Sequence, residues 1–148
     1  MEISFIKCGH PLWEKTIAFA EGCSWVAGPL LARIMRKNEF AEEERIIVAH
    51  EDDKILGYCT FSRKDEMPVD CDYTPFIGFV FVDEGSRGKR ISEKMINAAC
   101  DYAKELGFKI IYIMSGEKGL YEKYGFEKLG DFKTIYGTVD QLFQKKLK

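Results

Sequence analysis

The residues of this sequence with the clearest chemical potential lie between positions 82 and 92, where two glycines stand among three cationic side chains. These residues are Gly85, Arg87, Gly88, Lys89 and Arg90. An apolar run that indicates a strand ends just before them, and an amphipathic run that indicates a helix begins with them. A helix start presents unpaired N–H groups and the positive end of the helix dipole, and glycines let a ligand approach the main chain. We therefore predict an anion site, most naturally for a phosphate or pyrophosphate. The same residue types also occur in solvated strand–helix loops, and their spacing matches neither the Walker A motif nor the dinucleotide fingerprint.

A second motif, Gly119-Leu120-Tyr121-Glu122-Lys123-Tyr124-Gly125-Phe126, follows the next apolar strand in the sequence. Together with Arg87-Gly88-Lys89-Arg90, it resembles the GNAT superfamily of acetyl-coenzyme A-dependent N-acetyltransferases. Members of that superfamily typically carry R/Q-x-x-G-x-G/A at a loop-to-helix junction and a motif like L-Y-E-K-x-G-F farther along the chain. The expected order of strands and helices matches the superfamily over nearly the whole chain.

The resemblance implies an α/β (α+β) fold, in which helices flank a mixed, mostly antiparallel sheet with a central β-α-β coenzyme-binding crossover. It also implies transfer of an acetyl group from acetyl-coenzyme A (acetyl-CoA) to a primary amine, by direct attack in a ternary complex. The pyrophosphate would lie on the main-chain amides of about residues 85–90, and the pantetheine arm beside residues 79–82. The residues implied in coenzyme binding are Phe81, Val82, Gly85, Ser86, Arg87, Gly88, Lys89, Arg90 and Ser92. The main-chain N–H of Val82 or a neighbour would donate to the thioester oxygen.

Tyr121 matches the position of the superfamily's general acid, so the resemblance assigns to it the proton that the departing thiolate needs. A tyrosine suits this role, because a phenol with a pKa of about 10 stays protonated at neutral pH. Tyr124 lies three residues farther on, and we expect it to pack in the core with its hydroxyl satisfied. Trp25 is most simply a core residue as well. In this superfamily, however, the first two helices line the acceptor pocket, where Trp25 would face the substrate.

Two residues depart from the superfamily's pattern. Arg90 stands where glycine is preferred, and we expect it to crowd the loop unless its side chain points outward. Ser92 stands where glycine or alanine is preferred, and its small side chain should be tolerated.

Carboxylates near the expected site are candidates for the base that deprotonates the amine. They are Asp83 and Glu84 after the central strand, and Asp65, Glu66, Asp70 and Asp72 in an acidic loop. Such charge runs are usually solvated surface, and many relatives remove the proton through ordered water. Cys71 is a poor nucleophile, because the aspartates on both sides would raise its pKa, which argues against a ping-pong mechanism.

Composition narrows the class of protein. Of the 148 residues, 46% are hydrophobic and 14% aromatic, which suits one folded domain spanning residues 1–148. A net charge of −2 gives no basic field, so we expect no nucleic-acid partner. No apolar run approaches the ~20 residues that span a bilayer, and no signal-peptide layout is present, so we expect no membrane partner.

Five cysteines without a CxxC pair favour reduced thiols in a cytoplasmic protein. His10 and His50 are too isolated for a metal site, and we expect no bound metal.

Strands and helices must position these segments. Apolar runs and β-branched residues predict strands at about 3–7, 45–50, 55–61, 76–82, 109–114, 126–129 and 132–136. Helical spacing predicts helices at about 12–23, 24–40, 89–106 and 119–124. Gly107 is expected to cap the third helix, and Gly28-Pro29 to start or kink the second. The lysine-ended tail at about 138–148 is predicted as a marginal helix, and His50, at a strand end, as half exposed.

Alternatives to this function stay open at this point. One keeps the enzyme and changes the donor to a longer coenzyme A thioester. Another is a catalytically silent coenzyme A-binding sensor or interaction module, and a third is a plain phosphate-binding module. The acceptor is a small-molecule amine or a protein amine, and the superfamily often forms homodimers.

Overall fold

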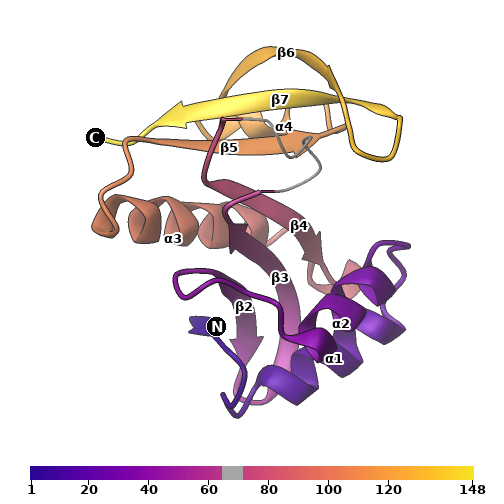
Figure 1. Cartoon of the computed structure of the whole chain (residues 1–148). Helices are drawn as coiled ribbons and strands as arrows, with labels where there is room; N and C mark the ends of the chain where they lie inside the picture. Colours follow the sequence, from indigo (N-terminus) through magenta and orange to yellow (C-terminus); the bar gives the residue numbers. More distant parts are fainter. Residues whose placement is uncertain (65–71) are drawn as a thin grey trace.

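The computed structural model describes residues 1–64 and 72–148, and in this part of the chain seven strands form a sheet with the order β1-β2-β3-β4-β5-β7-β6. Neighbouring strands are antiparallel except β4 and β5, which are parallel (Figure 1). The strands are β1 Glu2–Ile6, β2 Arg45–Glu51, β3 Lys54–Ser62, β4 Phe76–Val82, β5 Ile110–Ser115, β6 Glu127–Lys133 and β7 Val139–Lys146. The helices are α1 Trp13–Gly22, α2 Gly28–Lys37, α3 Ile91–Glu105 and α4 Leu120–Lys123, with a 3-10 turn, η1, at Glu84–Ser86. This mixed, mostly antiparallel sheet flanked by helices confirms the predicted fold class.

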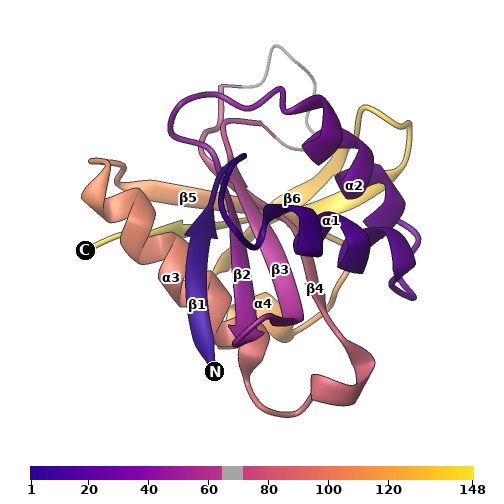
Figure 2. The ribbon, with the colours of Figure 1, turned by 90° about the horizontal axis from the view of Figure 1, so that it is seen from below.

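Helices cover both faces of the N-terminal half of the sheet, with α3 on one face and α1 and α2 on the other (Figure 2). Successive residues of a strand point to opposite faces. In β2, Ile47 accordingly packs with α3, whereas Ile46 and Val48 pack with α1 and α2. Because both faces are covered, this strand is apolar at successive positions, as the sequence shows.

The crossover from β4 to β5 passes through α3, and the end of this helix is fixed as the sequence predicts. Gly107 has a φ of 94°, a conformation that favours glycine. Its N–H donates to the Lys104 carbonyl at 3.0 Å, and the Phe108 N–H donates to the Ala103 carbonyl at 3.0 Å. This is the Schellman pattern, which turns the chain sharply out of the helix and into β5.

Helices α1 and α2 cross closely at Gly28, the first residue of α2. Pro29 follows it in the first turn of the helix, so the predicted start at this pair is confirmed. A side chain at position 28 would overlap the Ala20 carbonyl oxygen and Cys23 Sγ, so only glycine fits this contact.

The C-terminal tail was predicted as a helix, and this prediction is wrong. It forms strand β7, which lies between β5 and β6. The successive residues Leu142 and Phe143 are both fully buried, since both faces of β7 are covered at this point. A strand that is buried on both faces lacks the polar–apolar alternation by which strands are usually predicted. The lysines at the end of the tail are instead typical of a solvated helix, which is why the sequence predicts a helix here.

The segment before β7 also differs from the prediction of two strands at 126–129 and 132–136. One strand, β6, runs from Glu127 to Lys133, with an irregular register at Gly130. The next residues turn instead of continuing the strand. The Thr134 N–H donates to the Thr138 carbonyl at 2.8 Å, which closes the turn into β7.

Within the described ranges, the helices are too short or too polar to cross a bilayer. The thiols of Cys8, Cys23, Cys59 and Cys100 are free.

Candidate functional site

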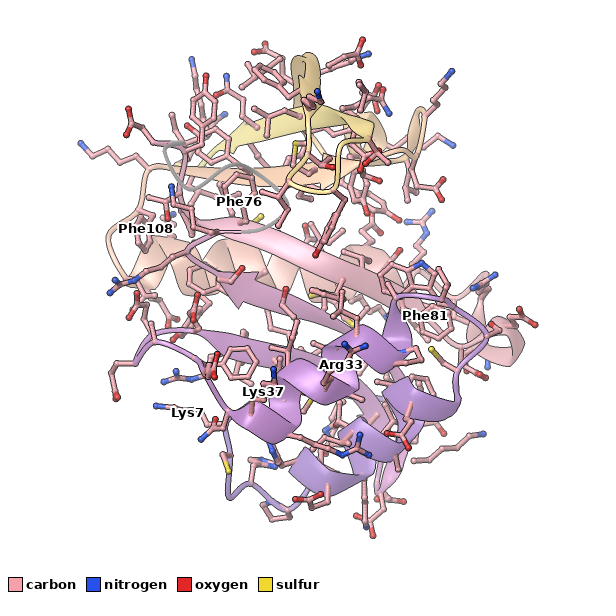
Figure 3. The ribbon with its side chains drawn as sticks, turned by 45° about the vertical axis from the view of Figure 1, so that its right-hand side comes forward. Lys7, Arg33, Lys37, Phe76, Phe81 and Phe108 are labelled. Carbon is pink, nitrogen blue, oxygen red and sulfur yellow. The ribbon has the colours of Figure 1, made fainter. Side chains whose placement is uncertain are left out.

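The central strands β4 and β5 separate soon after they meet. Register pairs join them at Phe76 with Tyr112 and at Ile77 with Ile113, and nowhere else along the two strands. Beyond these pairs the strands border a cavity of about 1150 Å³, which lies where the next hydrogen bonds of a regular sheet would be. Phe76 marks the paired end of β4 and Phe81 the end that borders the cavity (Figure 3).

A bulge in β4 faces this cavity. On its other side β4 pairs with β3 through Thr60 and Gly78, and then through Tyr58 and Phe81, so Phe79 and Val80 have no register partner in either neighbouring strand. Phe79 has a φ of 49°, which is uncommon for a residue with a large side chain. The regular register is interrupted at the bulge, so we expect main-chain groups here to be available to a ligand in the cavity.

The segment after β4 forms one end of the cavity. Of the residues predicted to bind coenzyme, those that line the cavity are Phe81, Val82, Arg87, Gly88, Arg90 and Ser92. Gly85, Ser86 and Lys89 are not among the lining residues. Ser86 is buried beneath the loop, where its N–H donates to the Asp83 carbonyl at 2.9 Å, whereas Gly85 and Lys89 are exposed.

Arg87 folds back over the end of β4. Its Nε donates to the Val82 carbonyl at 3.1 Å, and its guanidinium carbon lies 5.6 Å from the centroid of the Phe81 ring. These contacts hold one positive charge at the boundary between the loop and the apolar part of the cavity.

Arg90 shows why glycine is favoured at its position. It is the residue before the first turn of α3, and its φ of 60° places it in the left-handed region. Its side chain points outward and is 82% exposed, 3.9 Å from the Glu93 carboxylate. The loop is therefore not crowded, and the cost of the arginine is backbone strain.

We expect Arg90→Gly to raise the free energy of unfolding by about 0.5–1 kcal/mol, because glycine adopts this conformation without a Cβ clash. Urea denaturation measures the change. Lys89→Gly is the matched control, since Lys89 is exposed and has no positive φ. It should lose about 0.5–1 kcal/mol through the greater entropy of the unfolded chain. Equal losses in both variants would contradict this account of the strain.

Tyr121 lies on α4 and borders the cavity from the C-terminal half of the sheet. It is 4% exposed, and its ring packs edge-on against Phe126 and at 5.6 Å from Phe143. Burial raises the pKa of its phenol to about 12, while a hydrogen bond with Ser115 acts in the opposite direction. The phenol is therefore protonated throughout the physiological pH range and can donate a proton into the cavity.

Tyr124 connects α4 with α3. Its hydroxyl and the Ser92 hydroxyl are 2.9 Å apart, and its carbonyl accepts a hydrogen bond from Lys145 Nζ at 2.9 Å. These contacts agree with the expected packing role with a satisfied hydroxyl, although Tyr124 also lines the cavity. The hydroxyl at position 92 thus forms a hydrogen bond that glycine or alanine could not.

The candidate bases are dispersed. Glu84 lines the cavity, Asp83 does not, and Asp72 is exposed. Asp65, Glu66, Asp70 and Cys71 lie outside the described residues. Among residues 1–64 and 72–148, no cluster of three or more histidine, cysteine or carboxylate side chains could hold a metal ion.

His50 was predicted to be half exposed, and it is 5% exposed. Its Nδ1 is 2.7 Å from the Asp52 carbonyl oxygen, and its Nε2 is 2.8 Å from the Ser4 hydroxyl. Strand β1 pairs alongside β2 here and places Glu2 opposite His50. This long-range pairing, which is invisible in the local sequence, covers the imidazole.

Two carboxylates that the sequence does not mark as site residues also line the cavity, Glu117 after β5 and Asp140 on β7. The buried Gln141 supports this region, because its side-chain amide donates to the carbonyls of Ser115 and Glu117 at 3.3 and 2.9 Å. No local signal could reveal Asp140 or Gln141 while their segment was predicted as a helix.

Trp25 lines the cavity, which is where we expect it if the first two helices border the acceptor pocket. Its ring stacks on that of Phe81, with centroids 5.9 Å apart and planes 2° apart. It meets Phe79 edge-on at 6.1 Å. The loop between α1 and α2 therefore contributes an ordered aromatic surface to the site.

Comparison with known proteins identifies the fold and the family. A sequence profile of the acetyltransferase (GNAT) family matches residues 12–126. The solved structure of aminoglycoside 6'-acetyltransferase type Ii has a TM-score of 0.75 at 16% identity, over 100% of this chain and 98% of that chain. An aminoglycoside 6'-N-acetyltransferase complexed with coenzyme A has a TM-score of 0.74 at 14% identity, with the same coverage of 100% and 98%. A GNAT family acetyltransferase from Elizabethkingia anophelis with acetyl-CoA bound has a TM-score of 0.67 at 18% identity, over 99% and 97%. No curated protein matches the sequence.

Proposed function

Since the chain belongs to the GNAT family of acetyltransferases, we propose that it binds acetyl-CoA between β4 and β5 and transfers the acetyl group to a primary amine by direct attack in a ternary complex. The observation that carries this proposal is that the buried Tyr121 lines the same cavity as Arg87, Gly88 and Arg90.

The residues at the cavity fit the parts of the coenzyme. Within residues 85–90, the N–H groups of Ser86 and Arg87 donate to carbonyls of the turn itself, which leaves those of Gly88, Lys89 and Arg90 as candidates for the phosphates. The three cationic side chains of this segment are exposed and can reach the same anion. Phe79 and Val80 have no register partner in β3 or β5, so the pantetheine arm can lie beside the main chain at this bulge. A pre-oriented N–H at Val82 or at this bulge would stabilise the oxyanion that forms at the thioester carbonyl, a contribution of about 2.7–4 kcal/mol.

The transfer requires several proton movements. The ammonium group first loses a proton to water, because only the neutral amine can attack. The amine nitrogen then bonds to the thioester carbonyl carbon and the carbon–sulfur bond breaks, while Tyr121 donates its phenolic proton to the departing thiolate sulfur. The tyrosinate recovers a proton from water before the next turnover. Glu84 and Glu117 are exposed where they line the cavity, so water reaches the site from this side and accepts the amine proton. The described carboxylates need not act as a dedicated base.

The experiment that tests this function combines coenzyme binding with turnover. Titration calorimetry should show binding of coenzyme A, with far weaker binding of inorganic phosphate at the same concentration. Release of free thiol from acetyl-CoA should depend on an added primary amine. Coenzyme binding without turnover for any amine would favour the catalytically silent sensor. Equal binding of phosphate and coenzyme A would favour a plain phosphate module. Faster thiol release from coenzyme A thioesters with longer acyl chains would indicate that the transferred group is a longer acyl group and not acetyl.

The pKa of Tyr121 predicts the alkaline side of the pH profile. A group with a raised pKa keeps its proton up to that pKa, so the acid form of Tyr121 persists until about pH 12. We therefore expect that ionisation of Tyr121 does not lower kcat at saturating substrates between about pH 8 and 10.5. A phenol with an ordinary pKa of about 10 would instead be half ionised at pH 10, and kcat would fall by half there. Rates at each pH, with enzyme returned to pH 8 as the stability control, provide the measurement. A reversible fall centred near pH 10 would contradict the prediction.

A further inference from the structure

We propose that Ser115 and Gln141 are positioning residues for proton donation by Tyr121: Gln141 fixes the turn after β5, and this turn aims the Ser115 hydroxyl at the phenolic oxygen. Both roles rest on the proposed acetyl transfer, because the two residues act only through Tyr121. A chain of hydrogen bonds that begins in β7 and ends at the cavity supports them.

Gln141 connects β7 to the turn that follows β5. Strand β7 lies beside β5, and its register places Gln141 opposite Ser115, the last residue of β5 (Figure 1). The side-chain amide is buried, and it donates to the Ser115 carbonyl at 3.3 Å and to the Glu117 carbonyl at 2.9 Å. Both bonds are strongly favoured, because a buried polar group without a partner is costly. Gln141 therefore fixes the main chain on both sides of Gly116.

This turn holds the hydroxyl of Ser115. The main-chain N–H of Glu117 donates to Ser115 Oγ at 3.0 Å. A hydroxyl has one proton to donate and two lone pairs that accept. Because the N–H of Glu117 occupies one lone pair, the serine proton stays available for a second partner. Ser115 and Tyr121 both line the cavity, and their side chains are hydrogen-bonded to each other.

The direction of this bond matters for catalysis. When Ser115 donates to the phenolic oxygen, the proton of Tyr121 can point toward a thioester sulfur bound in the cavity. After that proton has moved to the sulfur, the tyrosinate carries a negative charge at a buried position, which is unfavourable. The hydrogen bond from Ser115 stabilises this charge, and it accordingly lowers the pKa of Tyr121 against the effect of burial. Ser115 keeps its own proton throughout, and water reprotonates the tyrosinate.

The ring of Tyr121 is held by other contacts. Its carbonyl accepts a hydrogen bond from the Phe126 N–H at 3.0 Å, and its ring packs against those of Phe126 and Phe143. Loss of the Ser115 hydroxyl should therefore leave the ring in place and alter only the hydrogen bond of the phenol.

Removal of the serine hydroxyl is the first test. Ser115→Ala is expected to lower kcat for amine-dependent thiol release about tenfold, the size expected for one hydrogen bond to a charged group. KM for acetyl-CoA and KM for the amine should not change. Ser115→Thr keeps a hydroxyl on a side chain that strands favour, so its kcat should stay within about threefold of the unchanged protein's. An unchanged kcat in Ser115→Ala would overturn the proposal.

A double-mutant cycle shows whether Ser115 acts through Tyr121. Tyr121→Phe has no phenolic oxygen, so adding Ser115→Ala to it should lower kcat by less than about twofold. If the hydroxyl served the packing of β5 or touched the substrate, the loss would be about tenfold in both backgrounds, and the proposal would be wrong. Absence of amine-dependent release from the unchanged protein, or full activity in Tyr121→Phe, would count against the proposed function itself, and the positioning roles would fall with it.

Removal of the buried amide is the second test. Gln141→Met keeps an unbranched side chain of similar length, and we expect kcat to fall about five- to tenfold because the turn no longer aims the serine hydroxyl. In the Tyr121→Phe background the same change should lower kcat by less than about twofold. Near-ultraviolet circular dichroism reports whether each variant folds, and the Ser115 cycle decides the proposal if Gln141→Met does not fold.

Gln144→Met is the matched control. Gln144 lies on the same strand, its amide donates to the exposed Glu127 carboxylate at 3.2 Å, and it is not among the residues that line the cavity. Its kcat should equal that of the unchanged protein. Equal losses in Gln141→Met and Gln144→Met, or a loss in Gln141→Met that persists in the Tyr121→Phe background, would show that Gln141 does not act through Tyr121 and would overturn its role.

Discussion

Replacing Tyr121 by phenylalanine is expected to lower kcat for acetyl transfer about 100-fold, while the affinity for coenzyme A stays nearly unchanged. The size follows from the usual contribution of a general acid, about 10²–10⁴-fold. The substitution removes one hydroxyl group and keeps the ring that packs against Phe126 and Phe143, so the fold is preserved. Steady-state thiol release gives kcat, and calorimetry gives the coenzyme affinity.

Tyr124→Phe is the matched comparison for this prediction. Tyr124 lies on the same turn, but its hydroxyl is engaged with Ser92 at 2.9 Å. We expect its kcat to change less than about tenfold, because the lost bond connects two helices and carries no proton to the sulfur. If Tyr124→Phe lost more activity than Tyr121→Phe, the proton donor would be Tyr124 and the assignment of Tyr121 would be wrong.

Gly28→Ala is expected to lower the free energy of unfolding by about 2–3 kcal/mol, the largest stability effect that we predict. The new methyl group would overlap the Ala20 carbonyl oxygen and Cys23 Sγ, which forces α1 and α2 apart. Main-chain atoms of α1 cannot give way without disturbing the helix. The displaced loop carries Trp25, so KM for the amine should also rise.

Urea denaturation measures this loss. Gly22→Ala is the control, since Gly22 is the last residue of α1, has no positive φ, and has open space where a side chain would be. Alanine there should leave stability unchanged or raise it by up to about 1 kcal/mol. A loss below 0.5 kcal/mol in Gly28→Ala would show that the helices do not need this close crossing.

The sequence predicts most of this fold because its elements carry local signals. The β2–β3 hairpin, the α3 crossover and its cap at Gly107 all depend on spacing and turn chemistry within short segments. The errors fall where partners distant in sequence decide the structure. Strand β7 is fixed by β5 and β6 on both sides, and the lysine-rich tail gives no sign of either.

The candidate site divides in the same way. The anion segment and Tyr121 belong to continuous motifs, so residue types alone locate them. Arg90 departs from the family's pattern in the sequence alone, whereas its left-handed conformation and outward side chain are visible only in the structure. Asp140 reaches the cavity only through the pairing of β7, and the bulge at Phe79 has no signature in a run of apolar residues.

Only two register pairs join β4 to β5, so few main-chain contacts hold the two halves of the sheet together at this boundary. Trp25 and Phe79 line the cavity from the β4 side of the boundary, and Tyr121 lines it from the β5 side. A molecule held in the cavity therefore touches both halves, and its binding energy opposes their separation. Occupancy should slow hydrogen exchange at the amides of β4 and β5 more than elsewhere.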